Sequence, residues 1–454
     1  MASPFLATAA LDMAALADLD RRHLVHPHQR SDRTDRAVIV RGQGCAVWDA
    51  DGAEYLDATG GANWLCQVGH GRAELAEAAA EQLRQLPYFT SFDVFSNDKS
   101  IRLATRLAGL APAGLGQVFF TCGGSEGVDT AIKAARLYHH RRGESERTWI
   151  LARRFGYHGA TYGSGTATGF DGMQHAVGPN LPHVHKLTPP FPYHSEWFEG
   201  RGCTDFLIDE LAAAIEQIGA HNIAAMIGEP VMAGGGVVPP PDDYWPRVRA
   251  LLRHNGILLI ADEVVTAFGR TGAWFDSPGR GMDPDMIVTA KGLTSGYAPL
   301  GAVLFNEDIA AAVTDDGFFH GYTYFGHPTA CAIALANLDL IENEGLLDRS
   351  RQIGAWLREG LTAAESLPVV GDIRMAGATI GVELVADRAT REPIMAGPAA
   401  TEIRKAHGVI VRDYGNTVVI APPLVMDEQQ AARTVEAMTS VLTRLHPDGT
   451  IAPR

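Results

Sequence analysis

The chain has 454 residues, of which 46% are hydrophobic and 20% charged, and its formal net charge is -15. This composition is typical of a globular protein with a large core, and the acidic balance argues against nucleic acid or an anionic membrane as a partner. No window approaches the roughly 20 apolar residues of a membrane span, and residues 1–20 lack the basic region of a secretory signal. A cytoplasmic protein is therefore expected. The five scattered cysteines and the histidine pairs have no metal-ligand spacing, so no metal site is expected.

The middle of the chain alternates between short apolar runs and helical patterns. Before this region, around residues 46–57, the hairpin signal Asp-Ala-Asp-Gly separates two short apolar runs. Strands are then predicted at 117–121, 148–152, 223–230, 256–264, 286–291 and 301–305, with amphipathic helices between them, for example at 128–143 and 243–256. The alternation predicts an α/β domain with a mostly parallel sheet.

The end of the chain follows another pattern. A long helical pattern over 329–361 precedes strand-like stretches at 378–385 and 417–425 and a last helix. This order is typical of an α+β unit. We therefore expect a large domain over 66–330 and a small domain built from both chain ends, 1–65 and 331–454.

Lysine is rare in this chain, with five lysines among 38 Lys and Arg residues. Lys291 ends the run Met-Ile-Val-Thr-Ala-Lys and precedes a glycine-rich turn, and Asp262 ends the preceding predicted strand. Because parallel strands carry ligand-binding groups at their carboxyl ends, we expect the two side chains to lie together. The alternative is a partly buried salt bridge. Arg would serve a salt bridge equally well, so a lysine here favours amine chemistry.

A possible phosphate site comes earlier, in the stretch Phe-Phe-Thr-Cys-Gly-Gly-Ser-Glu-Gly. A strand that runs through a Gly-Gly-Ser turn into a helix near Glu126 aims free amides at an anion near Gly124 and Ser125. The alternative is that Ser125 only caps the helix.

A lysine, a strand-end aspartate and a phosphate-binding turn together fit pyridoxal phosphate (PLP). Lys291 would form an imine with its aldehyde, and Asp262 would keep its pyridine nitrogen protonated.

Longer motifs give the chain a resemblance to a known family. FGYHGAT, ADEVVTAFGRTG, TAKGLTSGYAPLGAV and HGYTYFGHPTACA occur in this order. They resemble the class III aminotransferases of PLP fold type I, and among these the omega-amino acid:pyruvate aminotransferases. The resemblance covers nearly the whole chain. It implies a large domain with a mostly parallel sheet of the seven-stranded type, a small α+β domain from both chain ends, and a homodimer with shared active sites.

The resemblance also implies roles for single residues around the cofactor. Tyr157 resembles the aromatic residue that stacks on one face of the pyridine ring, and Val264 resembles the aliphatic residue on the other face. Glu229 matches a glutamate near the cofactor. Thr323 resembles the threonine that reaches the phosphate of the neighbouring subunit's cofactor.

Three more residues match substrate-binding positions. Trp64 and Phe92 resemble aromatic residues of the substrate pocket. Arg412 matches the arginine that clamps a substrate carboxylate and swings away when the substrate has none. Gly234 stands where relatives that use 2-oxoglutarate carry a glutamate, which favours pyruvate-type acceptors.

One motif departs from the family pattern, because Gly127 and Val128 replace the usual Ala-Asn after the phosphate turn.

The predicted activity is a PLP-dependent transamination that proceeds by a ping-pong cycle through pyridoxamine phosphate. It would move an amino group from an omega-amino acid or primary amine to pyruvate or a similar keto acid. An aminomutase or decarboxylase on the same fold, and a catalytically silent PLP-binding regulator, are the alternatives.

Overall fold

The computed structural model describes residues 13–28, 36–173 and 177–454. Its central sheet has seven strands, six running in one direction and β10 opposite to them. In spatial order the strands are β4 (Gln117–Thr121), β10 (Gly301–Phe305), β9 (Met286–Thr289), β8 (Leu258–Asp262), β7 (Ile223–Gly228), β5 (Trp149–Arg153) and β6 (Val184–Leu187). The mostly parallel sheet predicted from the sequence is confirmed.

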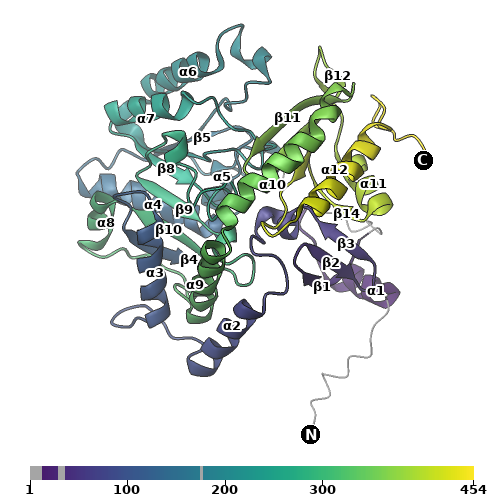
Figure 1. Cartoon of the computed structure of the whole chain (residues 1–454). Helices are drawn as coiled ribbons and strands as arrows, with labels where there is room; N and C mark the ends of the chain where they lie inside the picture. Colours follow the sequence, from purple (N-terminus) through teal and green to yellow (C-terminus); the bar gives the residue numbers. More distant parts are fainter. Residues whose placement is uncertain (1–12, 29–35, 174–176) are drawn as a thin grey trace.

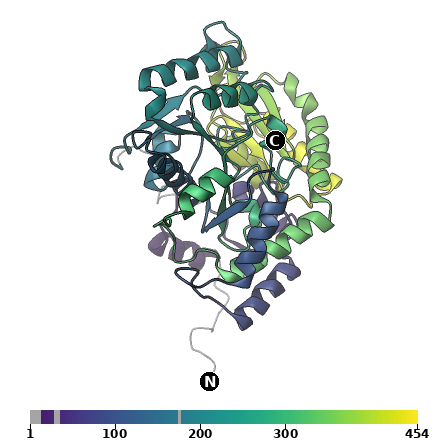
Figure 2. The ribbon, with the colours of Figure 1, turned by 90° about the vertical axis from the view of Figure 1, so that its left-hand side faces the viewer.

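Helices cover both faces of this sheet (Figure 1). One face packs against α4 (Gly124–Arg141), α5 (Tyr162–Ala167) and α8 (Glu307–Thr314). The other face packs against α3 (Asp98–Leu110), α6 (Cys203–Ile218), α7 (Tyr244–His254) and α9 (Pro328–Asn343). Since both faces are buried, the central strands are apolar runs rather than alternating ones. In Figure 2 this part of the molecule faces the viewer, and the C-terminal elements lie behind it.

Two smaller sheets lie beside the large one. The first contains β1 (Ile39–Gln43), β2 (Ala46–Asp49), β3 (Glu54–Asp57) and β14 (Val409–Ile410). The second contains β11 (Val370–Ala376), β12 (Thr379–Asp387), β16 (Thr417–Ile420) and β15 (Arg412–Tyr414), and β13 (Glu392–Pro393) pairs with β12. β14 pairs in parallel with β3, so the two ends of the chain share one sheet.

The remaining helices are α1 (Met13–His23), α2 (Ala73–Gln85), α10 (Leu346–Leu361), α11 (Gly397–His407) and α12 (Glu428–Leu442). Within the described residues, no helix is long and apolar enough to cross a membrane. The domain boundaries stay predictions, and residues 1–12 and 29–35 of the predicted N-terminal segment lie outside the described residues.

Two local expectations need adjustment. The helical pattern over 329–361 forms two helices, because the chain turns at Gly345, whose φ of +63° is a left-handed conformation that ends α9. The helix expected near Glu126 begins two residues earlier, at Gly124, with Gly123 at the N-cap instead of Ser125. The hairpin predicted around residues 46–57 is the antiparallel pair β2–β3.

Candidate active site

Asp262 and Lys291 follow neighbouring parallel strands. Asp262 is the last residue of β8 and pairs in register with Val288 of β9, and Lys291 begins a short 3₁₀ turn just beyond β9. Both side chains therefore belong to the same carboxyl edge of the sheet. Lys291 has a φ of +42°, which is unfavourable for a residue with a Cβ atom and is typical of functional turns.

The charges around Lys291 shift its titration. Burial lowers the pKa of Lys291 to about 8, while the carboxylates of Asp262 and Glu229 oppose the shift and the guanidinium groups of Arg270 and Arg412 add to it. A sizeable fraction of the side chain is therefore a neutral amine near pH 7.5. A neutral amine can attack a carbonyl carbon, whereas an ammonium ion cannot.

Asp262 is held by a histidine that the sequence analysis missed. The Asp262 side chain is buried, and its Oδ2 atom accepts a hydrogen bond from Nδ1 of His158 at 2.7 Å. Its Oδ1 atom accepts from the backbone N–H of Val264 at 3.1 Å. His158 follows Tyr157 in the FGYHGAT motif, so that motif was the available signal, although the contact spans 104 positions of sequence.

The carboxylate of Glu229 accepts hydrogen bonds from backbone N–H groups rather than from other side chains. Its Oε1 atom accepts from the N–H of Tyr157 at 3.1 Å, and its Oε2 atom accepts from the N–H of Ala233 at 2.9 Å. Burial raises the pKa of Glu229. The carboxyl group thus fixes the turn that presents the Tyr157 ring, which is 39% exposed.

The N-terminus of α4 lies against the turn after β8. A Cβ atom on Gly124 would come within 2.8 Å of a Val264 methyl group, so only glycine allows this approach. Ser125 lies beside the loop that follows Tyr157, and its Oγ accepts from the N–H of Ala160 at 3.2 Å. The first amides of a helix point beyond its end, so α4 aims donors and the positive end of its dipole at this region.

The same helix explains the departure of Gly127 from the family motif. A Cβ atom on Gly127 would come within 2.7 Å of the Val288 side chain in β9. The glycine therefore lets α4 pack closely on the strand that leads to Lys291. The change affects helix packing and leaves the N-terminal amides in place.

The outer wall comes from the smaller sheets and their loops. Trp64 is 2% exposed, and its ring lies 5.7 Å from Nζ of Lys291 and 5.1 Å from the ring of Tyr414. The guanidinium carbon of Arg412 lies 5.6 Å from the Tyr414 ring, and the buried Nε of Arg412 has no hydrogen-bond partner among the described residues. Tyr414 is a second residue that the sequence analysis missed.

Thr323 and Phe92 lie elsewhere, on a pair of exposed loops. The Phe92 side chain packs against Gly321, and the hydroxyl of Tyr88 donates to the backbone oxygen of Thr323 at 2.6 Å. Within the described parts of the chain, the hydrogen bonds and ring contacts of the Asp262 and Lys291 side chains are with other residues, and none joins them to Thr323 or Phe92.

Comparisons with known proteins agree with this arrangement. A profile of the family described as aminotransferase class-III matches residues 28–442. The putrescine–pyruvate aminotransferase of Pseudomonas aeruginosa is 35% identical over 425 residues, covering 91% of this chain and 92% of that protein. A thermostable (S)-enantioselective omega-transaminase from Thermomicrobium roseum is similar in structure, with 41% identity, a TM-score of 0.91, and coverage of 94% and 98%. So is a PLP-bound amine transaminase from an uncultivated Pseudomonas species, with 42% identity, a TM-score of 0.88, and coverage of 92% and 97%.

The chain therefore belongs to the class III aminotransferases, and its cofactor is PLP. The family, the fold and the cofactor expected from the sequence are confirmed. The residues present fit the group, because they include a half-buried lysine of lowered pKa, a buried carboxylate, and a helix N-terminus that glycine brings close to the turn after β8. PLP supplies a reactive aldehyde and an electron sink when it is bound.

Proposed function

We propose that this aminotransferase moves an amino group from an omega-amino acid or a primary amine to pyruvate or a similar keto acid. The observation that carries the proposal is the placement of Lys291, whose pKa is lowered to about 8, between the buried carboxyl group of Asp262 and the wall that contains Arg412. The inner part of this site, which contains Lys291 and Asp262, would supply the chemistry. The outer part, which contains Trp64 and Arg412, would select the substrate. The relative that acts on putrescine and pyruvate supports the choice of substrates.

Each inner residue has a role in this proposal. Lys291 would hold the cofactor through its amine, and its Nζ, when free, would take and return a proton. The Asp262 carboxylate balances a positive charge on the ring nitrogen. Tyr157 and Val264 would hold the two faces of the ring, and Glu229 supports the turn of Tyr157.

The phosphate would lie at the N-terminus of α4, where the amides of Gly124 and Ser125 act as donors. A phosphate is also favoured by the positive end of the helix dipole. The helix amides would hold the phosphate independently of Lys291, so the chain has two separate groups that would bind the cofactor.

The outer residues recognise the substrate. Arg412 clamps a carboxylate through two parallel N–H donors, as a guanidinium can. Trp64 forms an apolar wall for the donor, whereas Phe92, on the exposed loops with Thr323, would reach a donor only in the neighbouring subunit's site. Gly234 places no carboxylate opposite Arg412, which favours a small acceptor such as pyruvate over 2-oxoglutarate.

A homodimer with shared active sites is part of the proposal, with Thr323 reaching the phosphate in the neighbouring subunit. The loops around Thr323 and residues 88–95 carry exposed aromatic side chains, which are enriched at protein interfaces. These side chains are Tyr88, Phe89, Phe92, Phe95, Phe319 and Tyr324. Light scattering should give twice the chain mass, and Thr323→Ala should weaken PLP binding without changing that mass. A monomer with full activity would contradict this part.

The large domain over 66–330, the small domain from both chain ends and a cytoplasmic location complete the proposal. All five cysteines are free thiols, which is typical of proteins in a reducing compartment.

A donor panel tests the reaction. Purified protein is incubated with β-alanine, putrescine or an arylalkylamine together with pyruvate, and alanine formation is measured. In parallel, 2-oxoglutarate replaces pyruvate and glutamate is measured. Alanine with at least one donor, and little glutamate, is the expected result. Carbon dioxide release or an isomeric amino acid without consumption of a keto acid would instead support a decarboxylase or an aminomutase.

A further inference from the structure

The turn that carries Trp64 has an unfavourable backbone. Four of its residues have left-handed φ angles, namely Gly60 (+57°), Gly61 (+76°), Ala62 (+64°) and Trp64 (+61°). Two of them are not glycine, and such residues adopt this conformation only where their surroundings enforce it. Some contact must therefore hold the turn.

Asp57, at the end of β3, makes that contact. Its Oδ1 atom accepts from the backbone N–H of Thr59 at 2.9 Å and from the Thr59 hydroxyl at 2.5 Å. Its Oδ2 atom accepts from the N–H of Gly61 at 2.7 Å and from Nε2 of His70 at 2.8 Å. The Thr59 hydroxyl in turn accepts from the N–H of Ala62 at 2.9 Å. One carboxylate, 2% exposed, thus directs the first half of the turn.

The charge on Asp57 is balanced in place. Burial lowers the pKa of His70, but the hydrogen bonds and charges of Asp57 and Cys66 together outweigh burial and raise that pKa to about 10. Burial raises the pKa of Asp57, yet its hydrogen bonds from His70 and Thr59 bring it below the ordinary value. A buried ion pair with all these donors in place can persist, whereas removal of one partner leaves the other charge uncompensated.

We propose that Asp57 is a positioning residue that holds Trp64 against Lys291 and so sets the width of the pocket for the apolar part of the amine donor. The turn has no other carboxylate among its described hydrogen-bond partners. This inference rests on the proposed function for its consequence in catalysis. The hydrogen bonds from Thr59, Gly61 and His70 to Asp57, called the clamp below, are a property of the apoprotein. The proposal gives a role in donor specificity to Asp57, which lies in the small sheet and not at the edge of the large sheet that carries Lys291 and Asp262.

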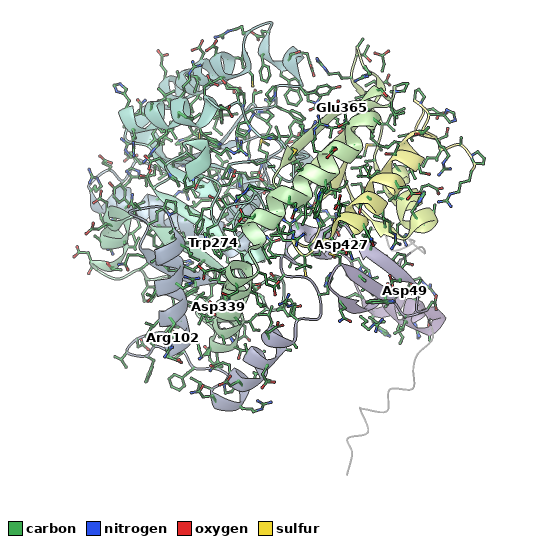
Figure 3. All side chains as sticks on the ribbon, in the orientation of Figure 1. Asp49, Arg102, Trp274, Asp339, Glu365 and Asp427 are labelled. Carbon is green, nitrogen blue, oxygen red and sulfur yellow. The ribbon has the colours of Figure 1, made fainter. Side chains whose placement is uncertain are left out.

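Asp49 offers a matched control within the same small sheet. It is 6% exposed and caps the turn between β2 and β3, accepting from the N–H groups of Asp51 and Ala53 and from the hydroxyl of Tyr55. Figure 3 labels Asp49 on this outer sheet. Asp49→Asn therefore measures the general cost of weakening a buried turn cap at a site without Trp64.

Hydrogen exchange tests the clamp without relying on activity. An amide at position 57 keeps one acceptor but turns an N–H group toward the remaining donors. In Asp57→Asn, peptides that cover residues 59–65 should exchange about tenfold faster than in the wild type, the scale of one lost hydrogen bond to a charged group. In Asp49→Asn these peptides should be unchanged. Equal exchange in Asp57→Asn and wild type would overturn the proposal. If Asp57→Asn does not fold, Thr59→Val gives the same comparison with a smaller expected change.

A double-mutant cycle tests whether Asp57 acts through Trp64. With a fixed arylalkylamine donor, Asp57→Asn should lower kcat/KM about tenfold in the wild-type background. In a Trp64→Leu background the same change should have little effect, because the positioned ring is already gone. Equal losses in both backgrounds would overturn the proposal. If the wild type transfers no amino group at all, the proposed function fails, while the exchange result still decides on the clamp.

Discussion

The site has two regions that are held in different ways. The inner region lies at the edge of the large sheet, where Asp262 is buried and both of its carboxylate oxygens accept hydrogen bonds from nearby donors. The outer region comes from the small sheets, and there the Nε atom of Arg412 lacks a hydrogen-bond partner in the described structure. A carboxylate whose oxygens both have donors is held in place, whereas a guanidinium with one unpartnered N–H group retains a donor that a substrate can use.

This difference predicts how substitutions behave. Changes in the inner region should reduce turnover of every donor, because all donors use the same chemistry. Changes in the outer region should separate donors by their charge and size. The four predictions below run from the largest expected effect to the smallest.

Lys291→Ala should abolish turnover with all donors. The helix amides of α4 should still retain some PLP, now without a covalent bond to the protein, so the absorbance of lysine-bound cofactor should be absent. Lys186→Met is the matched control, because burial lowers the pKa of Lys186 to about 7 as well, but this lysine donates to the backbone oxygen of Thr168. The control should keep near-normal activity. Near-normal activity of Lys291→Ala would remove Lys291 from the mechanism.

Asp262→Asn should slow every donor by about 10² to 10³, the general scale for removing one preorganised electrostatic partner. The shape of the side chain is kept, so the loss reports on charge. Glu263→Gln is the neighbouring control. Glu263 is fully buried, burial raises its pKa to about 7, and it accepts from the N–H of Ser277, so its role is to hold a turn. The control should lower the melting temperature and leave kcat within a few-fold; normal turnover of Asp262→Asn would contradict the role of its charge.

The inner region was largely predictable from sequence, because its signals are local. Apolar runs that end on Asp262 and Lys291 place both at one sheet edge, and the Gly-Gly-Ser turn marks the start of α4 within two residues. His158 was missed because a histidine beside an aromatic residue has no pattern of its own. Its role depends on a partner 104 positions away.

In the outer region, only the family resemblance pointed to Trp64 and Arg412, and Tyr414 was missed. The rings of Trp64 and Tyr414 come from opposite ends of the chain, and their centres lie 5.1 Å apart. No periodicity in the sequence predicts such a long-range contact. The clamp at Asp57 is similar, since an aspartate at the end of a strand usually only caps a turn. The division of the 329–361 helix was missed because Gly345 lies within an otherwise continuous pattern.

Arg412→Ala should separate the two regions most clearly. Pyruvate and donors with a carboxylate should lose about 2 to 4 kcal/mol of binding, the scale of a charge-assisted bidentate pair. Simple amines without a carboxylate should keep their first half-reaction. The two half-reactions are measured separately by absorbance in a stopped-flow experiment. Equal losses for both kinds of donor would mean that Arg412 supports the fold instead of selecting the substrate.

His158→Phe should give the smallest of the four effects, about tenfold in kcat for every donor, because Asp262 keeps its charge and loses one charge-assisted donor. The ring still fills the buried space, so the loss reports on the hydrogen bond. His158→Asn is the rescue variant, since its amide N–H can take the place of Nδ1 and should restore most of the rate. In an Asp262→Asn background, His158→Phe should cost little more, because the charge that His158 orients is gone. A full tenfold loss in that background would show that His158 acts independently of Asp262.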